Sequence, residues 1–447
     1  MTGEKERKNL LIVRNDGPDA DNIAAFMLMY QWAKGKPDVE LVIIFEPRGV
    51  NCGLRTLKHN DQDSLDSLLK AHFSHVGFPI EIRLKGLLTE QHVEKVENIS
   101  EEDRELLRMA IKDSQCSVGD SQLHALLIAR DLAKCLSETL GASEPHAKFT
   151  ILVDNDGLPK KSPVNLTCHA PEHLFTRTPK GINEFYRSMG LDMPQRREEI
   201  EKWYHECIRE ADEKLPDQGF SIDELDLEGL KEKITAAKDV TFIEGASFKL
   251  LSRLLDDPEV AAKMDCFVQA GTLDLAGNIF NDQFNIALDP ESAECVLRRY
   301  KAFKSFTAVP SQTSQAIAFS VDSLEDYGFC GLARWTLSLN LRNDPAKVSD
   351  GTVTLKGQHC GEKVKLPDLA MLLLAFWPEK YPSEKTQVVL PETGSGPLLF
   401  RITDSDGIRI LLPKTGHTIV SIGVGYTGLL LNDLSLNDAG GNNQLLF

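Results

Sequence analysis

The sequence lacks three features that mark common classes of protein. Its nine cysteines are scattered and include no Cys-x-x-Cys pair or Cys/His zinc spacing, which excludes a zinc-ribbon type of site and favours buried thiols in a reducing compartment. No apolar run approaches the ~18 residues of a membrane span. An excess of positive charge is also lacking, since 50 Lys and Arg face 67 Asp and Glu for a net charge of −17, and this argues against a nucleic-acid partner, whose phosphates require a basic surface.

Several catalytic and targeting motifs are also missing. The chain has no Gly-x-Gly-x-x-Gly or Walker loop for phosphates and no His-Glu-x-x-His for a metalloprotease. Its charged first residues, MTGEKERKN, lead directly into an apolar segment and do not resemble a secretory signal. We therefore expect a cytoplasmic protein without a membrane or nucleic-acid partner.

Short apolar runs alternate with amphipathic segments along most of the chain. Strands are predicted at residues 10–13, 39–45, 149–153, 240–243, 267–269 and 306–309, and helices at 23–32, 248–255 and 366–376. The run at 39–45 is apolar except for Glu40, which is typical of a parallel strand covered on both faces. The pattern predicts an α/β fold with a mostly parallel sheet flanked by helices.

Two regions depart from this alternation. Residues 160–235 are polar, charged and predicted to be mostly helical, whereas apolar runs at 398–402, 408–412 and 418–422 predict β-hairpins with Gly turns. We therefore expect an α/β core over residues 1–385 with a helical insertion in 85–235. A β-rich C-terminal extension should follow over residues 386–447.

The most informative stretch is 266–296, CFVQAGTLDLAGNIFNDQFNIALDPESAECV. A strand ends in small residues, a Gly-Asn follows, and Asp289-Pro290-Glu291 favours a helix start. The stretch resembles the core of the calcium-dependent, inosine–uridine-preferring nucleoside hydrolases, with Asp282-Gln283 in place of the family's Ala-Glu. The resemblance implies a nucleoside-hydrolase-like fold and substrate-binding roles for Asn278, Gln283 and Asn285.

Residues 15–21, NDGPDAD, follow the first predicted strand and carry three carboxylates within six residues. Such oxygen ligands suit Ca²⁺ or Mg²⁺, although an Asp-rich turn that caps a helix explains them equally. The family has Asp-x-Asp-Pro-Gly-x-Asp-Asp here, so Arg14 and Ala20 replace two of its aspartates. The resemblance implies that Asp16 is a metal ligand and the catalytic base, and that Asp21 is a metal ligand.

Two later segments complete the implied metal site. Residues 240–255 resemble the family's strand and Gly-Pro-Leu-Thr-Asn segment, which implies that the backbone carbonyl of Phe248 is a ligand. Residues 366–370, LPDLA, resemble its His-Asp-Pro-Leu-Ala helix start, with Pro367 replacing the His. Asp368 then matches the last metal-binding aspartate, while the alternative is that it only caps a buried helix.

The resemblance implies a divalent-metal-dependent hydrolase that binds Ca²⁺ or another divalent cation. It would cleave the N-glycosidic bond of a nucleoside or modified ribosyl compound. The changes at Ala20, Gln283 and Pro367 keep two alternatives open: a catalytically impaired binding or regulatory protein, and an enzyme for a non-nucleoside substrate. The expected partner is a small ribosyl compound, and homo-oligomerisation stays open.

Overall fold

The structure is a computed structural model of the 447-residue chain. It describes residues 8–15, 20–33, 36–46, 101, 148–154, 190, 202, 209, 220–271, 273, 285–286, 289–321, 362–389, 399–402, 407–413, 418–425 and 428–433. Among these residues, no helix combines the length and apolar character needed to cross a membrane.

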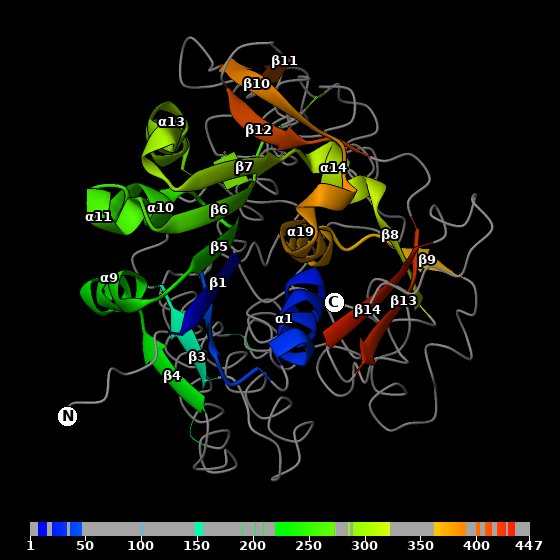
Figure 1. Cartoon of the computed structure of the whole chain (residues 1–447), viewed down its shortest axis with the longest axis horizontal. Coiled ribbons are helices and arrows are strands. Elements are labelled where there is room, and N and C mark those ends of the chain that lie inside the picture. The colour runs from blue at the N-terminus through cyan, green and yellow to red at the C-terminus, as the bar shows by residue number, and fades with distance from the viewer. Residues whose placement is uncertain are drawn as a thin grey trace.

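A ten-stranded sheet forms the centre of the molecule (Figure 1). Eight neighbouring strands, from β12 to β4, are parallel to one another, while β10 is antiparallel to both β11 and β12. The strands in spatial order are β11 (Leu399–Ile402), β10 (Ser383–Val389), β12 (Ile408–Leu411), β7 (Ser305–Val309), β6 (Met264–Gln269), β5 (Val240–Gly245), β1 (Asn9–Asn15), β2 (Val39–Phe45), β3 (Lys148–Val153) and β4 (Phe220–Glu224). The predicted mostly parallel sheet is confirmed.

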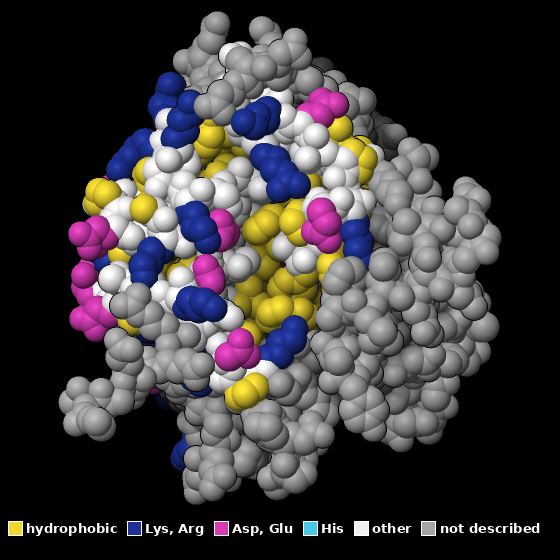
Figure 2. Space-filling view, viewed as in Figure 1, with side chains coloured by type: hydrophobic (Ala, Val, Ile, Leu, Met, Phe, Trp, Pro, Cys, Tyr) yellow, Lys and Arg dark blue, Asp and Glu magenta, His cyan; other side chains and the backbone are white. Residues whose placement is uncertain are grey.

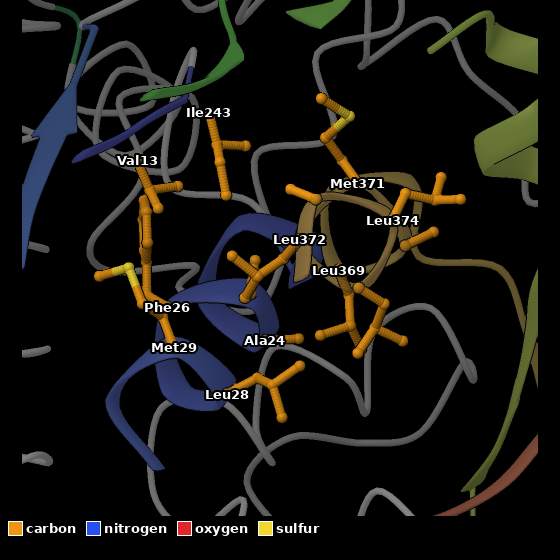
Figure 3. Packing of buried hydrophobic residues seen from close by; sticks show 14 of the residues in the cluster. Val13, Ala24, Phe26, Leu28, Met29, Ile243, Leu369, Met371, Leu372 and Leu374 are labelled. Atoms are coloured by element: carbon orange, nitrogen blue, oxygen red, sulfur yellow. The ribbon is translucent and has the colours of Figure 1, made fainter. Parts of the chain in front are cut away.

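Helices cover both faces of this sheet, as Figure 1 shows. Side chains alternate along a strand. Leu11 and Val13 of β1 therefore pack into one core with helices α1 (Ala20–Ala33) and α19 (Pro367–Phe376), whereas Leu10 and Ile12 pack into a second core on the other face. Figure 3 shows the first core, where Val13, Ile243, Phe26 and Leu372 meet. The helices are α1 (Ala20–Ala33), α9 (Leu227–Ala236), α10 (Lys249–Leu254), α11 (Pro258–Ala261), α13 (Pro290–Arg299), α14 (Ser311–Ala316) and α19 (Pro367–Phe376), with 3₁₀ turns η2 (Tyr300–Ala302) and η3 (Pro378–Lys380).

Helix α13 begins where its sequence predicts. The Asp289 side chain accepts a hydrogen bond from the backbone N–H of Ser292 at 3.1 Å, and Pro290 occupies the first turn. A capping side chain satisfies a backbone donor that the helix itself cannot satisfy. This cap fixes the helix start that follows the 266–285 stretch.

The carboxyl-terminal ends of α1 and α19 carry an aromatic pair. Trp32 and Phe376 stack with ring centroids 4.6 Å apart, and Lys36 Nζ lies 3.6 Å from the Trp32 ring centroid. Both rings are partly exposed. In the space-filling view, hydrophobic surface lies over these two helices among charged side chains (Figure 2).

The structure corrects one prediction for the C-terminal strands. Strands β11 and β12 were predicted to form a hairpin, but β10 lies between them. Residues 160–235 were predicted to be mostly helical; the described part of this stretch contains strand β4, which pairs with β3, and most of helix α9, while most of the stretch lies outside the described residues. A second sheet has the order β14 (Gly428–Asp433), β13 (Thr418–Gly425), β8 (Ala318–Ser320) and β9 (Lys363–Val364). The antiparallel β13–β14 pair agrees with a hairpin, and the domain division at residue 385 stays a prediction.

Candidate functional site at the carboxyl edge of the sheet

The predicted site residues fall partly outside the described residues. Asp16, Asn278 and Gln283 lie there, and nothing tests their predicted roles. Asp21 is the second residue of α1, where the structure describes its backbone. The remaining three predicted residues, Phe248, Asn285 and Asp368, are described with their side chains.

Asp368 lies next to residues that flank Asp16 and Asp21 in the sequence. The Nδ2 group of Asn22, a fully buried side chain, donates a hydrogen bond to Asp368 Oδ2. A methyl group in place of the Gly245 hydrogen would lie 3.1 Å from Asp368 Oδ1 and would collide with Asn15 Oδ1. Asp368 therefore lies close to Asn15, the residue before Asp16, and to Asn22, the residue after Asp21.

Strand pairing explains why distant segments meet at this place. Asn15 ends β1 and is the register partner of Gly245 in β5 and of Phe45 in β2. Parallel strands end at one edge of a sheet, which is where α/β proteins bind their ligands. Helix α19 begins at this edge and carries Asp368 in its first turn.

Phe248 offers a backbone carbonyl oxygen to the candidate site, whereas Asn285 offers a side-chain amide. Phe248 is fully buried and immediately precedes α10, and its carbonyl oxygen accepts a hydrogen bond from the backbone N–H of Ser252 at 2.9 Å. A carbonyl oxygen has a second lone pair, so this helix bond leaves one position for a ligand. Asn285 is buried and donates from Nδ2 to the backbone oxygen of Gln269 at 3.2 Å, a contact that fixes its amide at the end of β6.

On the other face of the same edge, a guanidinium is buried among three carboxylates. Arg14 Nη1 lies 3.0 Å from Glu244 Oε1, and its Nη2 lies 3.0 Å from Glu46 Oε2 and 3.1 Å from Asp154 Oδ2. Arg14 Nη1 also donates to the backbone oxygen of Ser247. All four charged side chains are at most 1% exposed. We call them the Arg14 cluster.

Alternation along the strands assembles the Arg14 cluster. Ile12 of β1 and Phe242 of β5 belong to the core beneath α9 and α10. Two residues further along each strand, Arg14 and Glu244 point to the same face. Glu46 follows β2 in the same way, and the ladder continues past the strand end because Glu46 N–H donates to Asn15 O at 2.8 Å.

Burial and the mutual charges shift the pKa values in the Arg14 cluster. Burial raises the pKa of Glu244 to about 8, and the nearby guanidinium of Arg14 offsets only part of the rise. Burial also raises the pKa of Glu46, against the opposing effects of Arg14 and Ser247. Burial alone would lower the pKa of Arg14, but the three carboxylates together raise it. The Arg14 cluster therefore carries a proton on Glu244 near neutral pH and keeps its guanidinium charged.

Sequence reasoning missed the Arg14 cluster. It treated Arg14 only as the replacement of a family aspartate and did not connect it with Glu46 or Glu244. One signal was present: the apolar strands β1, β2, β3 and β5 each have a charged residue within one position of their last residue, on the same face. Charged residues at the ends of four buried strands predict a polar cluster at the carboxyl edge.

The surroundings of Asp368 fit a hard cation. Asp368 Oδ1 and Asn15 Oδ1 approach the same point beside Gly245, and Ca²⁺ and Mg²⁺ prefer such carboxylate and amide oxygens. No group of three His, Cys, Asp or Glu side chains able to hold a metal occurs within the described ranges. The carboxyl groups of Asp16 and Asp21 are not part of those ranges, so a complete site would require them.

No protein-family model and no curated protein matches the sequence. Among solved structures, the chain is similar to the inosine–uridine-preferring nucleoside hydrolase of Bacillus anthracis, with 12% identity over 90% of this chain and 93% of that one and a TM-score of 0.43. It is similar in the same way to a plant nucleoside hydrolase, with 12% identity over 91% and 94% of the two chains and a TM-score of 0.43. It is also similar to the type III effector XopQ, solved with adenosine diphosphate ribose, with 11% identity over 89% of each chain and a TM-score of 0.39. Likeness of this degree carries no information about chemistry.

Proposed function

We propose that the chain is a divalent-metal-dependent hydrolase that cleaves the N-glycosidic bond of a nucleoside or a related ribosyl compound. One observation supports this most: Asp368 lies beside Asn15 and bonds to Asn22, which is 346 residues away in the sequence. These neighbours flank Asp16 and Asp21. The sequence neighbours of Asp16 and Asp21 therefore meet Asp368 at one edge of the sheet, and this supports the hypothesis that the three carboxylates share one cation.

In this proposal the predicted site residues have three roles: metal binding, general-base catalysis and sugar binding. Asp16, Asp21 and Asp368, together with the carbonyl of Phe248, would hold the cation, which when bound would lower the pKa of its water. Asp16 accepts a proton from the attacking water as the general base. Asn278, Gln283 and Asn285 bind the sugar, and the amide of Asn285 is already fixed by its bond to Gln269 O.

A metal-binding protein with little catalytic activity is the second candidate. The specific observation that favours it is the Arg14 cluster, because the residue at the family's first aspartate is a guanidinium engaged by Glu46, Asp154 and Glu244. Ala20 and Pro367 also lack the side chains that the resemblance assigns to sugar binding and leaving-group assistance. A protein of this kind would bind the cation and a ribosyl ligand without turnover.

Base release from a panel of nucleosides, with and without added Ca²⁺, tests the proposal. We expect measurable release of base from at least one ribosyl compound but weak release from inosine and uridine. Ala20 cannot hydrogen-bond a ribose hydroxyl, and a site that has lost such a partner binds and cleaves the common nucleosides poorly. Asp16→Asn should lower turnover roughly 10²–10⁴-fold with little change in stability. Asp38→Asn, an exposed aspartate at the start of β2, is the matched control. Full activity of Asp16→Asn would refute the general-base role, and cation binding without any release would favour the second candidate.

A further inference from the structure

We infer that the side-chain oxygen of Asn15 is an additional ligand of the cation, and that Gly245 is the residue that leaves room for it. The inference rests on the proposed cation site and extends it to a residue that the family resemblance does not assign. It concerns the α1/α19 face of the sheet edge. The Arg14 cluster lies on the opposite face.

Burial gives Asn15 an environment in which its amide requires partners. Asn15 is 2% exposed and ends β1 between β5 and β2. Its Nδ2 group has no hydrogen-bond partner within the described part of the chain. A buried unsatisfied donor costs about 1–3 kcal/mol, so a second, favourable contact of the same amide must hold this orientation.

The favourable contact is on the oxygen side of the amide. Asn15 Oδ1 and Asp368 Oδ1 both face the position that a Cβ atom of residue 245 would take. Two acceptor oxygens repel each other unless a donor or a cation lies between them. Asn15 Nδ2 makes no hydrogen bond to Asp368, and a cation between the two oxygens accounts for the orientation of the amide.

Gly245 is required here for space and not for backbone conformation. A Cβ atom at this position would lie 3.1 Å from Asp368 Oδ1 and would collide with Asn15 Oδ1. Backbone neighbours on β1 hold Asn15 in register, so the strand cannot move away easily. Any side chain at residue 245 would push apart the two oxygens that we assign to the cation.

Calcium titration of the full-length protein, by calorimetry and by the luminescence of Tb³⁺ as a calcium substitute, tests the inference without an activity assay. Asn15→Leu removes the oxygen and should weaken Ca²⁺ binding roughly 10-fold or more. Asn15→Asp adds a charged ligand and should strengthen binding on the order of 10-fold. The matched controls are Asn9→Leu and Asn9→Asp at the other end of β1, about 20 Å away, which should leave affinity unchanged.

The Asn15→Asp result separates a ligand from a structural amide only together with Asn15→Leu. An added carboxylate attracts Ca²⁺ in either case, so Asn15→Leu must agree with it: if Asn15 were only a structural donor to Asp368, Asn15→Leu would lower the melting temperature of the metal-free protein and leave Ca²⁺ affinity unchanged. Unchanged affinity in both Asn15 variants, with binding intact in the unmodified protein, would overturn this inference and leave the proposed function standing. No Ca²⁺, Mg²⁺ or Tb³⁺ binding by the unmodified protein would overturn both.

Gly245→Ala gives an independent check. It should weaken Ca²⁺ binding at least as much as Asn15→Leu, because the methyl group displaces Asn15 Oδ1 and crowds Asp368 Oδ1. The double variant Asn15→Ala/Gly245→Ala relieves the collision and should fold with a melting temperature close to that of Asn15→Ala alone. A Gly245→Ala protein that is stable and binds Ca²⁺ with unchanged affinity would contradict the assignment.

Discussion

The two faces of one sheet edge balance their carboxylates by different means. Beneath α9 and α10, the guanidinium of Arg14 neutralises carboxylates that are almost completely buried. Beneath α1 and α19, Asp368 is only partly buried and receives an amide donor from Asn22. A side-chain cation makes the first face a fixed part of the fold, whereas the second face is suited to a cation from solution. Stability should therefore depend on the first face and ligand binding on the second.

The largest expected effect is that of Arg14→Met. It leaves three buried carboxyl groups without the guanidinium that binds them, and breaking a buried ion pair costs about 3–5 kcal/mol, a large share of a typical folding free energy. Urea unfolding measures the loss. The control is Arg298→Met, whose guanidinium is exposed and pairs with Glu294 within α13, so that its removal should change stability little. Equal effects of the two substitutions would show that the Arg14 cluster does not support the fold.

A smaller effect is expected for Ser247→Ala. Ser247 Oγ donates to Glu46 Oε1 at 2.6 Å, and its backbone N–H donates to Glu46 Oε2 at 2.9 Å. Only the hydroxyl bond is lost, and a hydrogen bond to a charged group contributes about 1.5–3 kcal/mol. The free energy of unfolding should fall by that amount, while Ca²⁺ affinity should not change. A change in affinity larger than the change in stability would mean that the two faces are coupled.

The pH dependence of stability sharpens the comparison further. Because the pKa of Glu244 is raised to about 8 in the folded protein, the folded state binds more protons than the unfolded state above the ordinary carboxyl range. Its contribution to stability is complete below about pH 4.5 and is lost as pH rises through about 8. Glu244→Gln keeps the acceptor oxygen and should flatten this decline in urea unfolding at a series of pH values. A decline of the same steepness in Glu244→Gln would refute the assignment to this residue.

The same comparison explains what the sequence was able to predict. Strand β2 was predicted with its observed bounds because six of its seven residues, VELVIIF, are apolar and the run is too short for a helix. Strand β4 was missed because FSIDE ends in two acidic residues, pairs only with β3 among the described strands, and lies in a charged region. Local pattern is informative when both faces of a strand are buried and fails at the end of a sheet.

The Arg14 cluster and the surroundings of Asp368 also differ in how far the sequence could predict them. Arg14 bonds to Glu244 across 230 residues of sequence and to Asp154 across 140, and no spacing rule links such partners. Asp368 became a candidate through a family resemblance, which relates distant residues that periodicity cannot relate. The charged residues near the ends of the buried strands were visible in the sequence. Which of them form ion pairs depends on the order of the strands in the sheet, and that order is known only from the fold.

The smallest effect on stability is expected for Asp368→Asn in the metal-free protein. The amide keeps the size of the carboxylate and removes a charge that, under the proposal, Asp16 and Asp21 would repel, so stability should be unchanged or slightly higher. Ca²⁺ affinity should nevertheless fall roughly 10–100-fold or more. Thermal unfolding with and without Ca²⁺ measures both. A large loss of metal-free stability would indicate that Asp368 serves to hold α19 and not to bind a cation.

A crystal structure of the protein grown with Ca²⁺ or Tb³⁺ tests the central claim most directly. The account predicts one ion at about 2.3–2.6 Å from carboxylate oxygens of Asp16, Asp21 and Asp368, on the α1/α19 face of the sheet edge. It also predicts that the Arg14 cluster is unchanged by the ion. Carboxyl groups of these three aspartates separated by more than ~10 Å, beyond the span of one shared ion, would contradict it.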